Sequence, residues 1–187
     1  LIFPLSYIAG DVLTEVYGFK RSRRVIWTGF GCLALTASVL WLVRLMPGES
    51  TWLQQTGQPA YDAILGGLTS GGIVLASLVA YLAGEFMNSV VLAKLKVATR
   101  GKWLWLRTIA STLVGEGVDS FVFVGIACLT GVFPWSLFWP LAVTNYIFKT
   151  AVEVLMTPLT YLVVNKLKKA EQEDYFDTHT KFKIVGD

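Results

Sequence analysis

Ionisable side chains lie inside long apolar stretches of this chain, where a charge is costly unless it is solvated or paired. Near the middle of a membrane helix such a charge costs about 2.5–3.5 kcal/mol. Carboxylates in these places bind cationic or hydrogen-bond-donating solutes, or carry protons. The residues concerned are Asp11, Glu15, Glu85, Glu116, Asp119, Lys149 and Glu153. Arg107 is a further candidate for this set, but it lies closer to the end of its stretch, from where it could instead reach the membrane surface.

The spacing of these residues places them together on single faces of helices. Residues three or four positions apart are neighbours on a helix surface. The pairs are Asp11 with Glu15, Glu85 with Asn88, Glu116 with Asp119, and Lys149 with Glu153, with Asn145 one turn before Lys149. Four polar faces on four helices predict one polar cavity between them.

A set of ion pairs that only holds the helices together is the structural alternative. Lys149 could neutralise one acid, such as Glu153 or Asp119. However, five or six central acids face this single lysine. A dry core cannot hold that excess ionised, so some acids must be protonated, hydrated or opposed by a cationic ligand. The composition of the cluster therefore favours a solvated binding site or a proton path.

The apolar stretches that position these residues are long enough to be membrane helices. Only 16% of the 187 residues are charged, against about 25% in a soluble domain. A run of about 18 or more apolar residues is typical of a membrane span. The sequence thus predicts an all-α, polytopic membrane helix bundle. Its five expected spans are residues 1–18, 25–43, 64–93, 103–130 and 137–165.

Several of these spans contain irregular features. The first span is near the lower length limit, and the third is longer than a bilayer requires. Pro158 is expected to kink the last span. Gly115 and Gly117 flank Glu116 and indicate either close helix packing or a local break that exposes backbone groups to a ligand. The third span also carries a stripe of small residues, which favours close helix packing over a docking surface for a partner; these are Gly72, Ala76, Ala80 and Gly84.

Lysine and arginine alternate along the connections between spans. They are numerous in the first and third connections and after the last span, whereas the second has only Arg44 and the fourth has none. The positive-inside rule therefore places the C-terminus in the cytoplasm. An upstream span would give six spans in all. Residues 1–169 are expected to form the bundle, and residues 170–187 a mobile cytoplasmic tail.

No motif for covalent chemistry stands out in the sequence. It lacks a phosphate-binding glycine-rich loop and a His-Glu-x-x-His motif, and its one histidine, His179, falls in the tail. We therefore expect a protein that is not an enzyme and that uses no cofactor or metal. An intramembrane hydrolase stays as an alternative, since pairs of aspartates can do chemistry, but Asp11 and Asp119 have no supporting motif. The net charge of +3 comes from basic residues between spans, so the partner it indicates is the lipid bilayer rather than nucleic acid.

Motifs along most of the chain carry a family resemblance. They are Asp11-Val-Leu-Thr-Glu-Val-Tyr-Gly18 followed by Arg21-Ser-Arg-Arg24, Gly84-Glu-Phe-Met-Asn88, Arg107-Thr-Ile-Ala-Ser-Thr112, Gly115-Glu-Gly-Val-Asp-Ser120 and Asn145-Tyr-Ile-Phe-Lys149. In this order they resemble the queuosine-precursor transporter family, also called the vitamin uptake transporter family. The resemblance runs from about Phe3 to Lys169. It implies six spans and an architecture similar to the substrate-binding subunits of energy-coupling-factor transporters.

The resemblance also implies a function and a set of site residues. Members are bacterial inner-membrane proteins that take up the 7-deazaguanines preQ0 and preQ1. Asp11, Asp119 and Lys149 match the family's buried charges, whereas Glu15 is the least secure match. Tyr146 and Phe148 are alternative aromatic candidates for stacking on the flat base. The expected substrate-binding residues are Asp11, Glu85, Asn88, Glu116, Asp119, Asn145, Tyr146, Lys149 and Glu153.

Other functions remain open at this stage. The chain could transport another small vitamin-like solute, or act as its substrate-binding subunit. An ion or proton channel is a further alternative, although the acids form no obvious ring on equivalent helices. A membrane subunit without transport activity is another. The sequence leaves undecided whether the protein forms a homo-oligomer or has an energising partner subunit.

Overall fold

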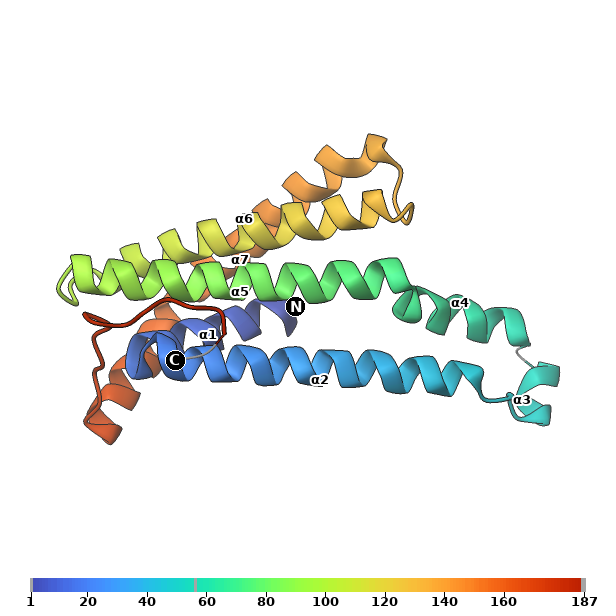
Figure 1. Ribbon diagram of the computed structural model, residues 1–187, viewed down its shortest axis with the longest axis horizontal. Coiled ribbons are helices and arrows are strands. Elements are labelled where there is room, and N and C mark those ends of the chain that lie inside the picture. Colours follow the sequence, from blue (N-terminus) through green and yellow to red (C-terminus); the bar gives the residue numbers. More distant parts are fainter. Residues whose placement is uncertain (1, 56, 186–187) are drawn as a thin grey trace.

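The computed structural model describes residues 2–55 and 57–185, and helices dominate this part of the chain (Figure 1). The long helices α2, α5 and α6 lie roughly along one direction, α7 crosses them obliquely, and the shorter α1 lies at the end where the C-terminal tail is found. The helices are α1 (Ile2–Tyr17), α2 (Phe19–Leu45), α3 (Ser50–Gln55), α4 (Gln58–Thr69), α5 (Gly71–Ala98), α6 (Leu104–Leu129), the 3-10 helix η1 (Trp135–Leu137) and α7 (Phe138–Glu171).

The predicted polytopic helix bundle is confirmed. Four helical stretches of the described chain are long and apolar enough to cross a membrane, namely Phe19–Leu45, Gln58–Ala98, Leu104–Leu129 and Trp135–Glu171. Helix α1 has 16 residues, a rise of about 24 Å at about 1.5 Å per residue, which is short of the hydrocarbon core of about 30 Å. Leu1, the first residue of the predicted first span, lies outside the described residues.

The expected third span, residues 64–93, is not one helix. Helix α4 ends at Thr69 and α5 begins at Gly71, because Ser70 between them has a non-helical ψ of 120°. Helix α4 is held to the end of α2 by a hydrogen bond from the Tyr61 hydroxyl to the Val43 carbonyl, at 2.8 Å. The connection before it contains the short helix α3. Of α4 and α5, only α5, which has 28 residues and continues to Ala98, is long enough by itself to cross a membrane.

Helices α5 and α6 pack closely because small residues line their contact. A Cβ atom added at Gly115 would lie 2.7 Å from the Cβ of Asn88 and 3.1 Å from the carbonyl oxygen of Gly84. Ala76 and Ala80, from the small-residue stripe of α5, are fully buried. The packing interpretation of that stripe is confirmed. Since α6 runs unbroken from Leu104 to Leu129, the alternative of a helix break at Gly115 and Gly117 is wrong.

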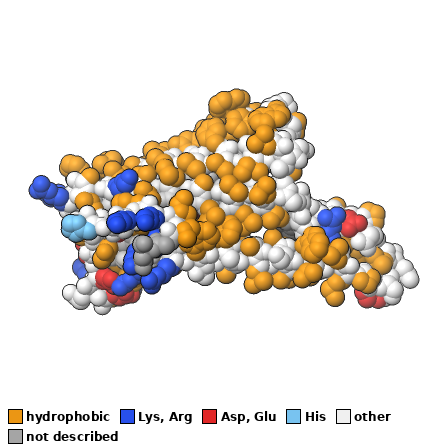
Figure 2. Space-filling view, in the orientation of Figure 1, with side chains coloured by type: hydrophobic (Ala, Val, Ile, Leu, Met, Phe, Trp, Pro, Cys, Tyr) orange, Lys and Arg blue, Asp and Glu red, His pale blue; other side chains and the backbone are white. Residues whose placement is uncertain are grey.

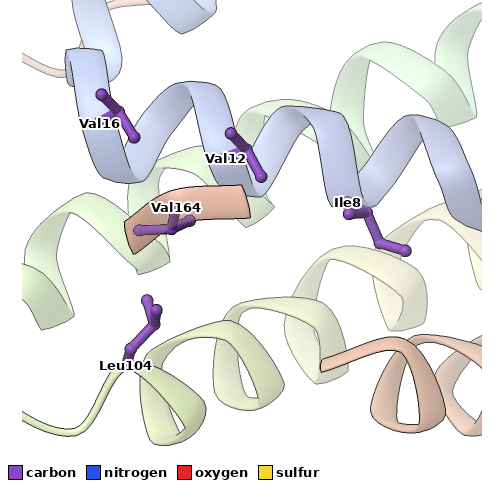
Figure 3. Packing of buried hydrophobic residues seen from close by; sticks show 5 residues of the cluster. All are labelled: Ile8, Val12, Val16, Leu104 and Val164. Carbon is purple, nitrogen blue, oxygen red and sulfur yellow. The ribbon is translucent and has the colours of Figure 1, made fainter. Parts of the chain in front are cut away.

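Apolar side chains both fill the bundle and cover its outside. Figure 3 shows α1, α6 and α7 meeting around a small core of Ile8, Val12, Val16, Leu104 and Val164. Hydrophobic side chains also cover much of the middle of the face seen in Figure 2, whereas lysine and arginine gather at one end. An exposed apolar surface of this kind is what a lipid-facing protein presents.

The C-terminal tail lies across the end of the bundle where the basic residues gather (Figures 1 and 2). The Tyr175 N–H donates to the Val16 carbonyl at 3.1 Å, and Asp177 accepts from the Phe19 N–H at 3.0 Å. Asp177 thereby caps the first turn of α2, which has no side-chain cap of its own at Gly18. Further along the tail, Phe182 packs edge-on against Phe19, with ring centroids 5.1 Å apart.

Candidate functional site

Lys149 of α7 connects two buried acids of α6. Its Nζ contacts Asp119 Oδ2 in a close ion pair and lies 3.2 Å from Glu116 Oε2. Glu116 is completely buried and Asp119 is 3% exposed. Neither oxygen of Glu116 accepts a hydrogen bond of normal geometry from a described residue. The cluster is therefore one cation between two carboxylates, and the Glu116 oxygens could still accept hydrogen bonds.

A second group of polar side chains joins α1 to α5. Asn88 donates its Nδ2–H to Asp11 Oδ1 at 2.6 Å, and both side chains are buried. Glu85, one turn earlier on α5, is also buried and points toward α1, since a Cβ added at Gly10 would lie 2.9 Å from its Oε2. The absence of a side chain at Gly10 thus makes room for this carboxylate.

Glu153 of α7 lies near Asp11 in a narrow polar pocket. Both carboxyl groups line this space together with residues of α6 and α7, which are Thr108, Ile109, Thr112, Val154, Thr157 and Thr160. Glu153 is 4% exposed. Neither of its carboxylate oxygens, nor the hydroxyl of Thr112, has a hydrogen-bond partner of normal geometry among the described residues. The space between these walls does not admit a water molecule.

The remaining two predicted site residues lie on α7 beside the lysine cluster. Tyr146 is half-buried and packs against α6, because a Cβ added at Gly117 would lie 3.6 Å from Tyr146 Cε2. Asn145 is half-buried one turn before Lys149. Gly117 therefore leaves space for the aromatic ring next to Glu116.

One buried ionic cluster was not anticipated from the sequence. Glu15 accepts two hydrogen bonds from Arg107, at 2.7 and 3.2 Å, and one from Lys168 at 2.7 Å. Lys96 Nζ lies 3.8 Å from the same carboxylate and 2.6 Å from Asp174 of the tail. Arg107 is 1% exposed, so of its two interpretations the structure supports a buried charge rather than a side chain that reaches the membrane surface. Arg107 and Glu15 lie far apart in the sequence, so no local pattern could predict that they pair.

Asp174 connects the tail to this ionic cluster. Burial raises the pKa of its carboxyl, but the hydrogen bonds from Lys168 and Lys96 outweigh burial and hold the pKa below its ordinary value. The tail thus contributes an ionised carboxylate to the cluster at neutral pH. The charges of Glu15 and Asp174 are opposed by Arg107, Lys96 and Lys168, so Glu15 does not belong to the uncompensated acids.

The predicted site residues lie in two neighbouring layers of the bundle. Glu116, Asp119, Asn145, Tyr146 and Lys149 form one layer, between α6 and α7. The second layer joins α1, α5 and α7, and it contains Asp11, Glu85, Asn88 and Glu153. Within the described residues, no group of three or more His, Cys, Asp or Glu side chains is placed to hold a metal ion.

A separate groove between α2 and α5 does not involve these residues. It has a volume of about 420 Å³ and is lined mostly by small and apolar side chains, such as Ala34, Trp41, Leu42 and Leu78. A polar solute would find few partners there. This groove is therefore a poorer candidate for binding a polar solute than the two layers are.

Comparison with known proteins places the chain among transporters. Residues 1–163 match the family model described as "Putative vitamin uptake transporter". A protein of Bacillus subtilis (strain 168) named "Probable queuosine precursor transporter" is 29% identical over 92% of this chain and 73% of its own length. The "Queuosine precursor transporter" of Escherichia coli (strain K12) is 26% identical over 89% of this chain and 72% of its own length.

A Haemophilus influenzae relative, also named "Probable queuosine precursor transporter", is 24% identical over 88% of this chain and 66% of its own length. No solved structure matches the chain. The family is one of transporters rather than enzymes, in agreement with the apolar helices and their buried charges. Because the family model matches most of its length, the chain belongs to the vitamin uptake transporter family.

Proposed function

We propose that this protein takes up queuosine precursors, 7-deazaguanines such as preQ0 and preQ1, across the bacterial inner membrane. Three relatives with this name support the proposal, each matching most of the chain. The gathering of lysine and arginine at the end that holds the tail supports a cytoplasmic C-terminus (Figure 2).

The main support for the proposed site is the buried carboxylate of Glu116, which lacks well-placed hydrogen-bond donors in the described chain. Its carboxylate is fully buried and accepts no hydrogen bond of normal geometry from described residues, although Lys149 lies 3.2 Å away. Buried acceptors are normally satisfied, so an exception indicates a missing donor. A deazaguanine presents an N1–H and an exocyclic amine on one edge, and one carboxylate can accept both. Glu116 is thus well suited to bind that edge of the base.

The neighbours of Glu116 suit the rest of such a solute. Asp119 would oppose the aminomethyl cation of preQ1, while Lys149 or Asn145 would approach the nitrile of preQ0. Tyr146, next to Gly117, would stack on the flat ring. We assign the second layer to the same pathway, with Asp11, Glu85, Asn88 and Glu153 along the route toward the cytoplasm.

Binding to purified protein tests this proposal directly. A panel of preQ0, preQ1, guanine, adenine and vitamins is titrated into the protein in detergent, and saturable uptake into proteoliposomes is then measured. We expect the deazaguanines to bind most tightly. Glu116→Gln should weaken their binding by about tenfold or more, since a hydrogen bond to a charged group contributes about 1.5–3 kcal/mol. Asp62→Asn, an exposed acid outside the bundle core, is the matched control.

The same experiment separates the alternatives. If a vitamin or an unmodified purine binds more tightly than the deazaguanines, that compound rather than a deazaguanine is the substrate. Flux that rises with concentration without saturating would identify a channel. Binding unaffected by Glu116→Gln would remove this residue from the site.

A further inference from the structure

Asp11 and Glu153 are two buried acids that share one narrow pocket between α1, α6 and α7. Asp11 is 1% exposed and Glu153 is 4% exposed. The two groups are close enough to interact electrostatically. Asn88 donates one hydrogen bond to Asp11, whereas neither oxygen of Glu153 has a partner of normal geometry among the described residues.

The cations near this pair are engaged elsewhere. On the cytoplasmic side, Arg107 and Lys168 bind Glu15 of α1. On the other side, Lys149 of α7 contacts Asp119 and lies near Glu116 of α6. No described lysine or arginine lies within salt-bridge distance of Asp11 or Glu153.

The other charged neighbours of the pair are also acids. Helix α5 contributes Glu85, which interacts with Asp11. Helix α6 contributes Glu116, which interacts with Glu153. Two carboxylates at close range in such a setting cannot both remain ionised, and the stable state of the pair holds one proton.

The size of the pocket decides which cation can neutralise the pair. In this conformation the space between the two carboxyl groups does not admit a water molecule, so neither a hydrated metal ion nor a flat heterocycle fits there. A proton needs no such space, because it binds directly to a carboxylate oxygen. The hydroxyl of Thr112, which lacks a hydrogen-bond partner of normal geometry, lines the same pocket and lies one turn before Glu116 on α6.

The position of the pair connects it to the proposed substrate layer. Glu153 follows Lys149 by one turn of α7, which is a rise of about 6 Å. Pro158 lies inside α7 five positions further on and leaves a gap in the backbone hydrogen bonding at which the helix can bend. A movement of α7 that accompanies solute binding would therefore change the distance between Glu153 and Asp11 of α1.

We propose that Asp11 and Glu153 form a proton-binding site that couples solute uptake to proton entry. This inference rests on the proposed uptake function. When separated, the two carboxylates carry a total charge of −2. As they come together they take one proton from the outer side, which changes the charge to −1, and they release that proton to the cytoplasm when α7 separates Glu153 from Asp11 again. One proton and one solute cross together, so the proton gradient drives accumulation.

The protonated pair can be observed without any transport assay. Infrared spectra of the purified protein, recorded as the pH is changed, report protonated carboxyl groups by their C=O stretching band. We expect the wild type to retain such a band at neutral pH and Glu153→Gln to lose it. Glu171→Gln, which changes an exposed acid at the end of the same helix, should keep the band. A spectrum unchanged by both Glu153→Gln and Asp11→Asn would overturn the proposal.

Transport then tests the coupling, with labelled preQ0 as the probe. In proteoliposomes, accumulation of preQ0 driven by an inward proton gradient should be lost in Glu153→Gln, whereas Glu171→Gln should accumulate preQ0 like the wild type. Asp11→Asn provides a second variant, because an asparagine can still accept the hydrogen bond from Asn88. If wild-type protein does not exchange preQ0, the proposed function fails. If it exchanges preQ0 and an imposed proton gradient causes no accumulation, the coupling inference alone fails.

Discussion

Glu15 and Arg107 form a buried ion pair across 92 residues of sequence, with hydrogen bonds of 2.7 and 3.2 Å between α1 and α6. Lys96 and Lys168 also lie within salt-bridge distance of the Glu15 carboxylate, so this one acid is the counterion of three cations. The two partners are therefore unequal. Removing Glu15 deprives three buried or half-buried cations of their shared counterion. Removing Arg107 still leaves the Glu15 carboxylate with two cations, Lys96 and Lys168.

Glu15→Gln is accordingly expected to destabilise the protein more than Arg107→Gln does. Breaking a buried pair by removing one partner costs about 3–5 kcal/mol, and we expect Glu15→Gln to fall in this range. Thermal unfolding of both variants in detergent measures the difference. Equal losses of stability, or a larger loss for Arg107→Gln, would contradict the arrangement described for Lys96 and Lys168.

Asp119→Asn should impair transport while the protein remains folded. Lys149 keeps Glu116 as a nearby counterion in this variant, 3.2 Å from its ammonium group. Loss of a charge-assisted hydrogen bond to the solute weakens affinity by about one to two decades. Solute binding and unfolding temperature are measured on the same preparation. Normal binding by well-folded Asp119→Asn would exclude this residue from the site.

A purely structural role for Asp119 has a different signature. The variant would then lose stability, because Lys149 is the residue left with fewer partners. Adding Lys149→Met to Asp119→Asn would recover folding in that case. The double variant therefore distinguishes a partner of lysine from a partner of the solute.

Gly115→Ala should destabilise the contact between α5 and α6. Its new Cβ would meet the Cβ of Asn88 at 2.7 Å and the Gly84 carbonyl at 3.1 Å, and neither is the end of a flexible side chain. Overpacking of this kind costs about 1–3 kcal/mol. Gly31→Ala in α2 is the control, since a Cβ there meets nothing within 4 Å and alanine favours a helix by about 0.5–1 kcal/mol. Equal unfolding temperatures for the two variants would argue against the close packing.

The docking of the tail should weaken in acid. The pKa of Asp174 lies below its ordinary value. Its carboxylate therefore stabilises the docked tail at any pH above the ordinary pKa, and this stabilisation is lost as the pH falls through the lowered pKa. A fluorophore attached at Lys181→Cys should report greater mobility at low pH. Asp174→Asn should show that mobility already at neutral pH. A tail that is equally mobile in wild type and Asp174→Asn at neutral pH would show that Asp174 does not hold it.

The orientation in the membrane can be tested with reporters. A fusion after Lys169 should read cytoplasmic, and one near Gly57 should read external, because lysine and arginine gather at the tail end of the bundle. Topology reporters whose signal depends on the compartment measure both positions. The same location for both fusions would disprove the predicted arrangement of spans.

The helical bundle, its membrane setting and its family could all be predicted from the sequence. Local chemistry is sufficient for these properties, because a long apolar run excludes water and must satisfy its backbone hydrogen bonds internally. The sequence also offered Glu153 and Asp119 as alternative partners of Lys149, and the structure pairs the lysine with Asp119. Which carboxylates lie on one helix face follows from the helical repeat alone.

The pairing of those charges was decided only by the tertiary structure. Helical spacing assigns residues to faces but does not specify how each helix is rotated and shifted against its neighbours. Thus Asn88 binds Asp11 across 77 residues, and Lys168 reaches Glu15 across 153. The separation of α4 from α5 at Ser70 and the burial of Arg107 also depend on contacts between distant segments. Since many acids were equivalent by sequence, only their packing distinguished Glu15, opposed by three cations, from Glu153, which has none within salt-bridge distance among the described residues.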